Sequence, residues 1–176
     1  VRIFHECDLA IAEAIECGLF DDVDVPTLAG LASVFVYESR ASAPELEPWS
    51  PDRSIERRVR TLEALTADIA TDERALGLPP TRIPDPGFFG LAHAWAAGDD
   101  LSTILGDDEI PGGDFVRIIR QLIDLLRQIG DASGDAATGA VARAAADALL
   151  RGVVAASGTR VAPIQQHDDA IDEDVP

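Results

Sequence analysis

Apolar residues recur at spacings of three and four along most of the chain, and strict alternation of apolar and polar residues is nearly absent. This period is typical of helices with one buried face, because 3.6 residues complete a turn of an α-helix. The pattern therefore predicts an all-α fold, a helical bundle of about six main helices. We expect these helices at about residues 2–17, 26–36, 52–76, 87–97, 114–129 and 136–156.

Glycine and proline mark the ends of several predicted helices. Gly18 follows the first helix and Gly98 the fourth, whereas Pro26 stands in the first turn of the second, where its missing N–H is not needed. Residues 78–86 hold four prolines in nine positions and cannot be helical. We therefore expect them to form an extended crossover on the surface.

Other signals mark the start of the fifth helix and the end of the last one. We expect residues 106–113 to form a loop and Asp114 to be the N-cap of the fifth helix. The helical period ends at Ser157, and the last nine residues include five carboxylates, a composition typical of disorder. The sequence therefore predicts a helical bundle domain over residues 1–157 and a disordered acidic C-terminal tail over residues 158–176.

The basic residues exclude several kinds of enzyme. All 14 are Arg, so the chain lacks the Lys that closes a phosphate-binding P-loop and the Lys that forms a Schiff base. The chain begins at Val1 instead of Met, and we expect it to be a fragment of a longer protein. Its formal net charge of −18 argues against a free-standing nucleic-acid binder, because phosphate contacts dominate that affinity.

The hydropathy and the two cysteines indicate in which cellular compartment the protein is expected. No apolar run approaches the roughly 20 residues that a membrane span needs, so we expect no membrane partner. Cys7 and Cys17 lie ten positions apart on one predicted helix and cannot pair with each other. Two unpaired thiols are typical of a reducing compartment, and we expect a cytoplasmic protein.

Several acidic runs invite a metal interpretation. Residues 168–172 match the DDxxD pattern of magnesium-dependent terpenoid synthases, but they lie in the predicted tail without a second metal motif. Residues 21–24 and 107–109 lack the ligand ladder of a calcium loop, which favours helix-end charges and polar turns. The histidines also form no metal signature: His5, His93 and His167. We predict no catalytic residue, metal ligand or cofactor site in this chain.

The fifth predicted helix has a strongly apolar face, with Phe115, Ile118, Leu122, Leu125 and Ile129 at alternating spacings. At 100° per residue the polar residues gather on the opposite face within roughly 60°, flanked by two arginines. We call these six residues the polar stripe: Arg117, Gln121, Asp124 and Gln128, with Arg120 and Arg127 beside them. Such donors and acceptors suit a strand of nucleic acid. The alternative is a solvated face with an Arg120–Asp124 ion pair.

A second basic cluster opens the third predicted helix. It comprises Arg53, Arg57, Arg58 and Arg60. Its simplest interpretation is a solvated helix face.

Four stretches follow one another in a recognisable order and spacing. They read LAGLASVFVYE at residues 28–38, AWAAGDDLSTIL at 94–105, GDFVRIIRQLIDLLRQI at 113–129 and LRGVVAAS at 150–157. Together they resemble the DSHCT domain, the C-terminal helical module of superkiller-type DExH-box RNA helicases. The resemblance covers about residues 2–157 and is greatest to the actinobacterial members of that family.

The resemblance implies a bundle packed against two upstream RecA-like motor domains of the same chain. Those domains bind ATP and magnesium, so the parent protein would be an ATP-dependent RNA helicase, whereas this fragment would hold no catalytic residue or cofactor. The fifth helix would be the ratchet helix, which lines the exit channel and guides single-stranded RNA, with DNA as an open alternative. A rival from another class is a non-enzymatic protein-interaction bundle.

The family's RNA-contacting pair is usually Arg and Glu, and it maps to Gln121 and Asp124 in this chain. Gln keeps hydrogen-bonding capacity without the charge, and Asp keeps the charge on a shorter side chain. Arg117 matches the family's Arg one turn earlier, and Arg120 is a further candidate contact. A channel wall needs only such a local stripe, so the charge of −18 excludes a stand-alone binder and not a helicase module.

Overall fold

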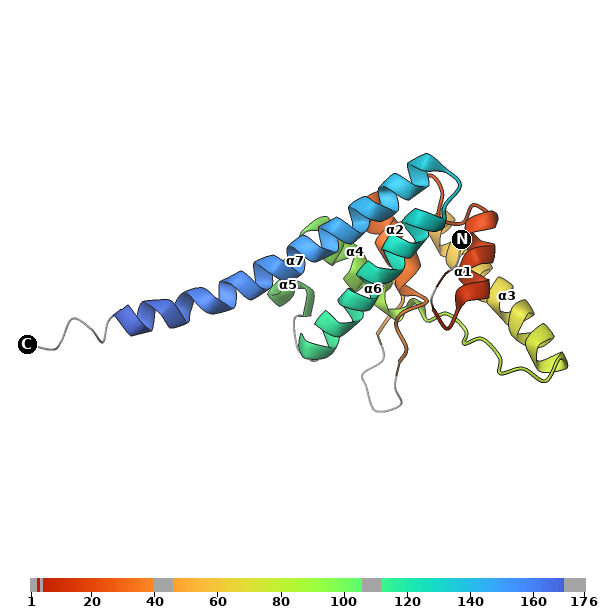
Figure 1. Cartoon of the computed structure of the whole chain (residues 1–176), viewed down its shortest axis with the longest axis horizontal. Coiled ribbons are helices and arrows are strands. Elements are labelled where there is room, and N and C mark those ends of the chain that lie inside the picture. Colours follow the sequence, from red (N-terminus) through yellow and green to blue (C-terminus); the bar gives the residue numbers. More distant parts are fainter. Residues whose placement is uncertain (1–2, 4, 40–45, 106–111, 170–176) are drawn as a thin grey trace, which may run out of the picture.

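The computed structural model describes residues 3, 5–39, 46–105 and 112–169, with the backbone alone at 101, 105, 112 and 157–169. Every regular element in these ranges is a helix, which confirms the all-α prediction (Figure 1). In chain order the elements are α1 (Asp8–Glu16), α2 (Val25–Ser33), α3 (Arg53–Ala75), the 3-10 helix η1 (Pro86–Phe88), α4 (Phe89–Ala97), α5 (Leu101–Leu105), α6 (Gly112–Ala132) and α7 (Ala136–Asp169).

Helix α2 occupies the centre of the bundle. Residues 27–33 are all buried, and α4, α6 and α7 pack around them. A short helix that is apolar on every side is stable only when neighbours cover it completely. The helix begins as the sequence predicts, with Pro26 in the first turn and the Asp24 carboxylate accepting the Thr27 N–H at 2.9 Å.

Helices α6 and α7 pack side by side along most of α6 (Figure 1). A short turn joins them, and Asp135 caps α7 by accepting the Thr138 N–H at 3.2 Å. The apolar face of α6 is buried against α7, α2 and α1. Its buried residues are Phe115, Ile118, Ile119, Leu122, Ile123, Leu125, Leu126 and Ile129.

Helix α4 lies between α2 and α7, and two of its aromatic rings pack directly on a glycine of each neighbour. A Cβ on Gly30 would lie 2.5 Å from the Phe89 ring, and a Cβ on Gly152 would lie 2.6 Å from the Trp95 ring. The Trp95 indole N–H also donates to the Leu149 carbonyl of α7 at 3.1 Å. Both approaches need glycine, because any larger side chain would displace a rigid ring.

Helices α1 and α3 form the opposite end of the bundle (Figure 1). Arg58 of α3 donates to the Leu19 and Asp21 carbonyls at 3.3 and 2.6 Å, which ties α3 to the turn after α1. The second basic cluster is therefore divided, because Arg58 has a structural role whereas Arg53, Arg57 and Arg60 are exposed. The expectation of a solvated face is wrong for Arg58 alone.

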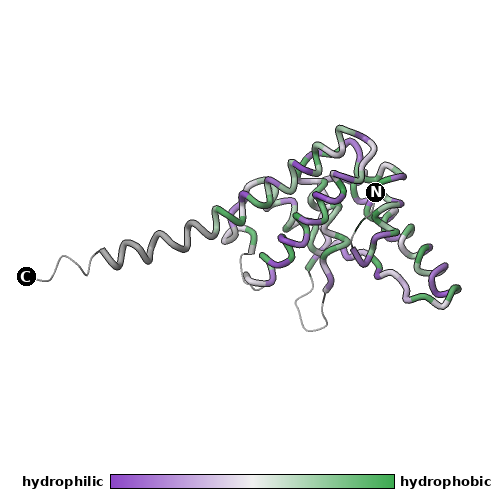
Figure 2. The backbone as a smooth tube through the Cα atoms, viewed as in Figure 1, coloured by the Kyte–Doolittle hydropathy of each residue, from purple (hydrophilic) through white to green (hydrophobic). Residues whose placement is uncertain are grey.

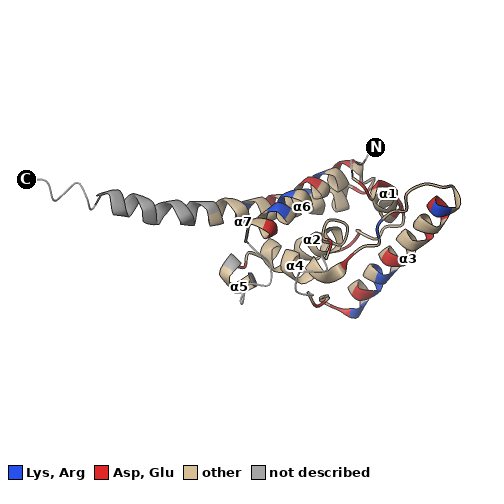
Figure 3. Ribbon diagram, turned by 90° about the horizontal axis from the view of Figure 1, so that it is seen from below, with Lys and Arg blue, Asp and Glu red and all other residues tan. Residues whose placement is uncertain are grey.

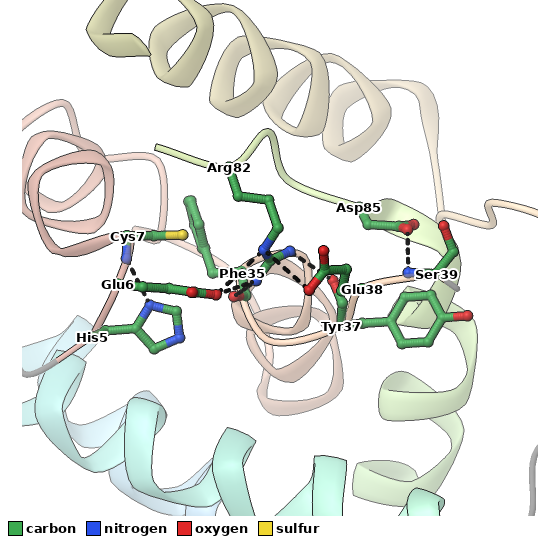
Figure 4. A network of polar contacts seen from close by, with 9 residues as sticks. All are labelled: His5, Glu6, Cys7, Phe35, Tyr37, Glu38, Ser39, Arg82 and Asp85. Carbon is green, nitrogen blue, oxygen red and sulfur yellow. Dashed lines mark hydrogen bonds and ion pairs between the residues drawn. The ribbon is translucent and has the colours of Figure 1, made fainter. Parts of the chain in front are cut away.

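The proline-rich crossover returns from α3 to η1 in an extended form, as predicted, and two polar residues fasten it (Figure 4). Arg82 donates to the Phe35 carbonyl at 2.9 Å and to the Tyr37 carbonyl at 3.0 Å, just beyond the end of α2. Its guanidinium also pairs with Glu6 at 2.9 Å. Asp85 accepts the Ser39 N–H at 3.1 Å. Cations suit this position because the carbonyls at the end of a helix lack partners within the helix.

Two helices begin at residues other than those predicted. Helix α1 starts at Asp8 instead of Arg2, because His5 forms a turn in which its Nδ1 accepts the Cys7 N–H at 3.0 Å and its carbonyl accepts the Asp8 N–H at 3.2 Å. Helix α6 starts at Gly112, so Asp114 lies in its first turn and is not its N-cap. An acidic residue is still favourable there because of the helix dipole.

Helix α7 begins as predicted but continues to Asp169, beyond the end expected near Ala156 (Figure 1). Residues 170–176 lie outside the described part of the chain, and the side chains of 157–169 do as well. The acidic tail over residues 158–176 therefore stays a prediction.

Hydrophobic and hydrophilic residues are interspersed along the helices of the bundle (Figure 2). In the described ranges, no helix combines the length and the apolar character required to cross a membrane.

Replacing Gly152 by alanine is expected to destabilise the bundle by about 2 kcal/mol, because the new methyl group overlaps the Trp95 ring. Urea unfolding followed by circular dichroism measures the change. Gly113→Ala is the matched control, since no atom lies within 4 Å of a Cβ there, and its expected effect is neutral to slightly stabilising. Equal stabilities of the Gly152→Ala and wild-type proteins would show that the contact between Trp95 and Gly152 does not require glycine.

The free energy of unfolding is expected to fall between pH 7 and pH 5 through His5. Burial lowers the pKa of His5 from its ordinary value of 6.5, against the opposing effect of Glu6. The unfolded chain therefore binds the proton more readily in this range, and the stabilising contribution present above pH 6.5 is lost as the pH falls. His5→Gln is expected to reduce the pH dependence in urea titrations at pH 5, 6, 7 and 8. Parallel curves for the two proteins would exclude this role.

Candidate nucleic-acid interface

The polar stripe of α6 faces away from the core. Arg117, Arg120, Gln121 and Asp124 are all exposed, whereas the apolar residues of the same helix are buried. Figure 3 shows basic and acidic positions along α6. The structure thus places all four predicted contact residues on the solvent side of one helix, as the 3.6-residue period requires.

Local contacts within the stripe differ from the expected ion pair. The Asp124 carboxylate accepts the Gln128 Nε2–H at 3.0 Å, and Arg117 Nη2 lies 3.5 Å from Asp114 Oδ1. No ion pair within 4.0 Å joins Arg120 to Asp124 in the part of the chain that the structure describes, so that expectation is wrong. The Gln128 amide, one turn along the helix, donates a hydrogen bond to the Asp124 carboxylate instead. Exposed pairs such as Arg117–Asp114 contribute little stability and separate readily.

The stripe offers a mixed set of hydrogen-bonding groups. The Arg117 and Arg120 guanidinium groups are donors suited to phosphate oxygens. The Gln121 amide both donates and accepts, and the Asp124 carboxylate only accepts. Such acceptors suit base amino groups and the ribose 2′-hydroxyl, which distinguishes RNA from DNA. The stripe therefore presents both hydrogen-bond donors and acceptors along one exposed helix face.

His5 lies near the stripe, which reasoning from the sequence missed. Among the polar contacts around Arg82, its ring lies on the side that faces α6 (Figure 4). The Asp124 charge raises the pKa of His5, against the larger effect of burial. Because Nδ1 accepts the Cys7 N–H, the neutral ring carries its proton on Nε2. Burial lowers the pKa of His5, so the ring is neutral at pH 7. No sequence signal links the two residues, since 119 positions separate them.

The acidic runs considered as metal sites have other roles where they are described. Asp24 caps α2, and Asp21 accepts the Thr138 hydroxyl at 2.7 Å, which links the turn after α1 to α7. Residues 107–109 lie outside the described residues, as do the side chains of the 168–172 motif. Among the residues that are described, no three His, Cys, Asp or Glu side chains are grouped to hold a metal ion.

Comparison with known proteins identifies the architecture. The family model described as "DSHCT (NUC185) domain" matches residues 1–157. "Probable helicase HelY" of Mycobacterium tuberculosis is 34% identical over 164 residues, which cover 88% of this chain and 18% of that protein. The protein of the same description in Mycobacterium leprae is 31% identical with the same coverage. "mRNA transport homolog 4" of Caenorhabditis elegans is 23% identical over 72% of this chain and 12% of that protein.

The chain spans less than a fifth of the length of these relatives. Two of the stretches that carried the resemblance also meet in the fold, because Trp95 of the second packs on Gly152 of the last. The matched residues contain all of α1 to α6 and the part of α7 within the bundle. The chain belongs to the DSHCT domain family.

Proposed function

We propose that this chain is the C-terminal helical domain of an ATP-dependent DExH-box helicase, and that α6 lines the nucleic-acid exit channel and guides single-stranded RNA. The observation that carries the proposal is the polar stripe, exposed on a helix whose other face is buried throughout. A helix anchored on three neighbours holds its exposed side chains at fixed spacings, one turn or about 5.4 Å apart.

Relatives described as helicases support the parent activity, and they are more than five times longer than the matched region. ATP and magnesium would bind in upstream RecA-like domains, since this chain has no Lys for a phosphate loop. The domain's own residues would hold and position the strand while those motor domains close. The two free thiols fit a reducing compartment, and we place the enzyme in the cytoplasm.

Charge sets how firmly the domain binds. The three arginines of α6 are matched by three aspartates, so the local charge is close to neutral in a chain of net charge −18. They are Arg117, Arg120 and Arg127, and Asp114, Asp124 and Asp131. The domain by itself would therefore bind RNA weakly, and the motor domains would supply most phosphate contacts. Weak contacts of this kind suit a strand that must slide. DNA in place of RNA is the alternative substrate.

In the full-length helicase, Gln121→Ala combined with Asp124→Ala is expected to lower the unwinding rate more than the RNA-independent ATPase rate. The two side chains would contact the strand but not ATP, and losing two hydrogen bonds of about 1 kcal/mol each corresponds to roughly 30-fold weaker contact. A strand-displacement assay and a coupled ATPase assay measure the two rates.

Asp147→Ala, on the exposed surface of α7, serves as the control and should leave both rates unchanged. Equal losses of unwinding and ATPase in the double variant, or no loss of either, would argue against a channel wall.

The isolated chain is expected to bind a uridine decamer only at low salt. Each phosphate contact contributes about 0.7 to the slope of log affinity against log salt for a single strand, so Arg117→Ala with Arg120→Ala should reduce that slope by about 1.4. Fluorescence anisotropy between 20 and 150 mM salt measures it, with about 150 mM as the concentration at which binding is lost. Arg74→Ala, at the exposed end of α3, is the control. Unchanged slopes in the double variant would place the strand elsewhere.

A further inference from the structure

A groove of about 480 Å³ lies between the segment 48–50 and the first half of α3, far from the polar stripe in the sequence. Its volume is in the range of sites that hold small molecules or short peptides. The apolar part of its lining consists of Pro48, Trp49, Val59 and Pro86.

Trp49 forms a fixed aromatic wall of this groove. Its ring is packed edge-on against His93 at a centroid distance of 4.9 Å, and it lies 6.2 Å from the Phe89 ring. Nevertheless 48% of Trp49 is exposed, whereas the other tryptophan, Trp95, is 3% exposed. A large indole that is held in place and still half open to solvent is typical of binding surfaces.

The polar side of the groove has an acidic excess. Glu56, Arg60 and Glu63 belong to one face of α3, at spacings of four and three. Arg60 pairs with Glu56 at 2.6 Å, which leaves the Glu63 carboxylate without a cation within 4.0 Å among the described residues. The groove therefore has an unneutralised negative charge beside its indole.

We propose that this groove docks an extended, proline-containing protein segment with one arginine or lysine, and that this cation pairs with Glu63. Proline rings pack flat on an indole, and a polyproline helix keeps its backbone groups in water, so the groove need not offer it main-chain partners. Two of the lining residues are prolines and have no N–H to donate, which disfavours strand addition. The partner's cation complements both Glu63 and the chain's overall charge of −18.

The same charges disfavour nucleic acid at this surface. Trp49 offers a stacking platform, but Glu56 and Glu63 outnumber Arg60, and a phosphate backbone would be repelled. The docking surface shares no residue with the polar stripe, and it does not depend on the helicase proposal.

Two synthetic peptides test the proposal on the full 176-residue chain, APPLPPRA and its charge-reversed counterpart APPLPPEA. Binding is read from the fluorescence of Trp49, because Trp95 is buried. The arginine peptide is expected to bind about five- to tenfold more tightly than the glutamate peptide, as for a partly exposed ion pair. Glu63→Arg should reverse this preference. Trp49→Ala should abolish the binding of both peptides, and because this variant lacks the fluorescent reporter, its binding is measured by isothermal titration calorimetry alongside the wild-type chain.

Glu16→Arg on the exposed surface of α1 introduces the same charge change outside the groove and should keep the original preference. The proposal is overturned if neither peptide changes the fluorescence up to about 1 mM, well above the weak affinities of such motifs. Equal affinities of both peptides in every variant would also overturn it. So would a uridine decamer that quenches Trp49 and binds more tightly after Glu63→Arg.

Discussion

The close approach of α4 to two glycines determines how the bundle is assembled. Phe89 takes the space of a side chain at Gly30 of α2, and Trp95 takes the space of a side chain at Gly152 of α7. The first contact covers the central helix α2, and the second connects α4 to α7, the helix on which α6 packs. Trp95 also packs edge-on against Phe115 of α6 at a ring-centroid distance of 5.1 Å, so one ring contacts both α6 and α7. Close-packed interiors transmit a shift of one helix to the next, which couples the position of α6 to this contact.

Because of this packing, the two faces of α6 have different roles. The buried face fills the core against α7 and α2, and the exposed face holds polar groups of both signs at helical spacings. Near Asp124 the surface is completed by His5, from a turn that Arg82 and the crossover keep against the end of α2. Under the proposed function, such a surface would need rigidity more than affinity, since a guided strand must move along it.

The interface and the groove illustrate different uses of charge in one acidic protein. On α6, arginines and aspartates nearly balance, so the proposed contact with a phosphate strand would be weak. At the Trp49 groove, the carboxylate of Glu63 exceeds the available cations, which favours a basic protein segment. Net charge describes the average of these surfaces, whereas recognition depends on the few groups within a Debye length of the ligand.

Much of the architecture was predictable from the sequence alone, because apolar periodicity, Gly98, Pro26 and the prolines of residues 78–86 act locally. The helical class, the third helix and the exposed stripe follow directly from that periodicity. The start of α1 at Asp8 and the Asp124–Gln128 contact did not follow, since side-chain hydrogen bonds compete with propensity there. The start of α6 at Gly112 did not follow either. Only the tertiary structure decided the ring contacts at Gly30 and Gly152 and the hydrogen bonds of Arg58. The same holds for the surroundings of His5 and Trp49. Each depends on contacts between residues distant in the chain, which a local pattern does not encode.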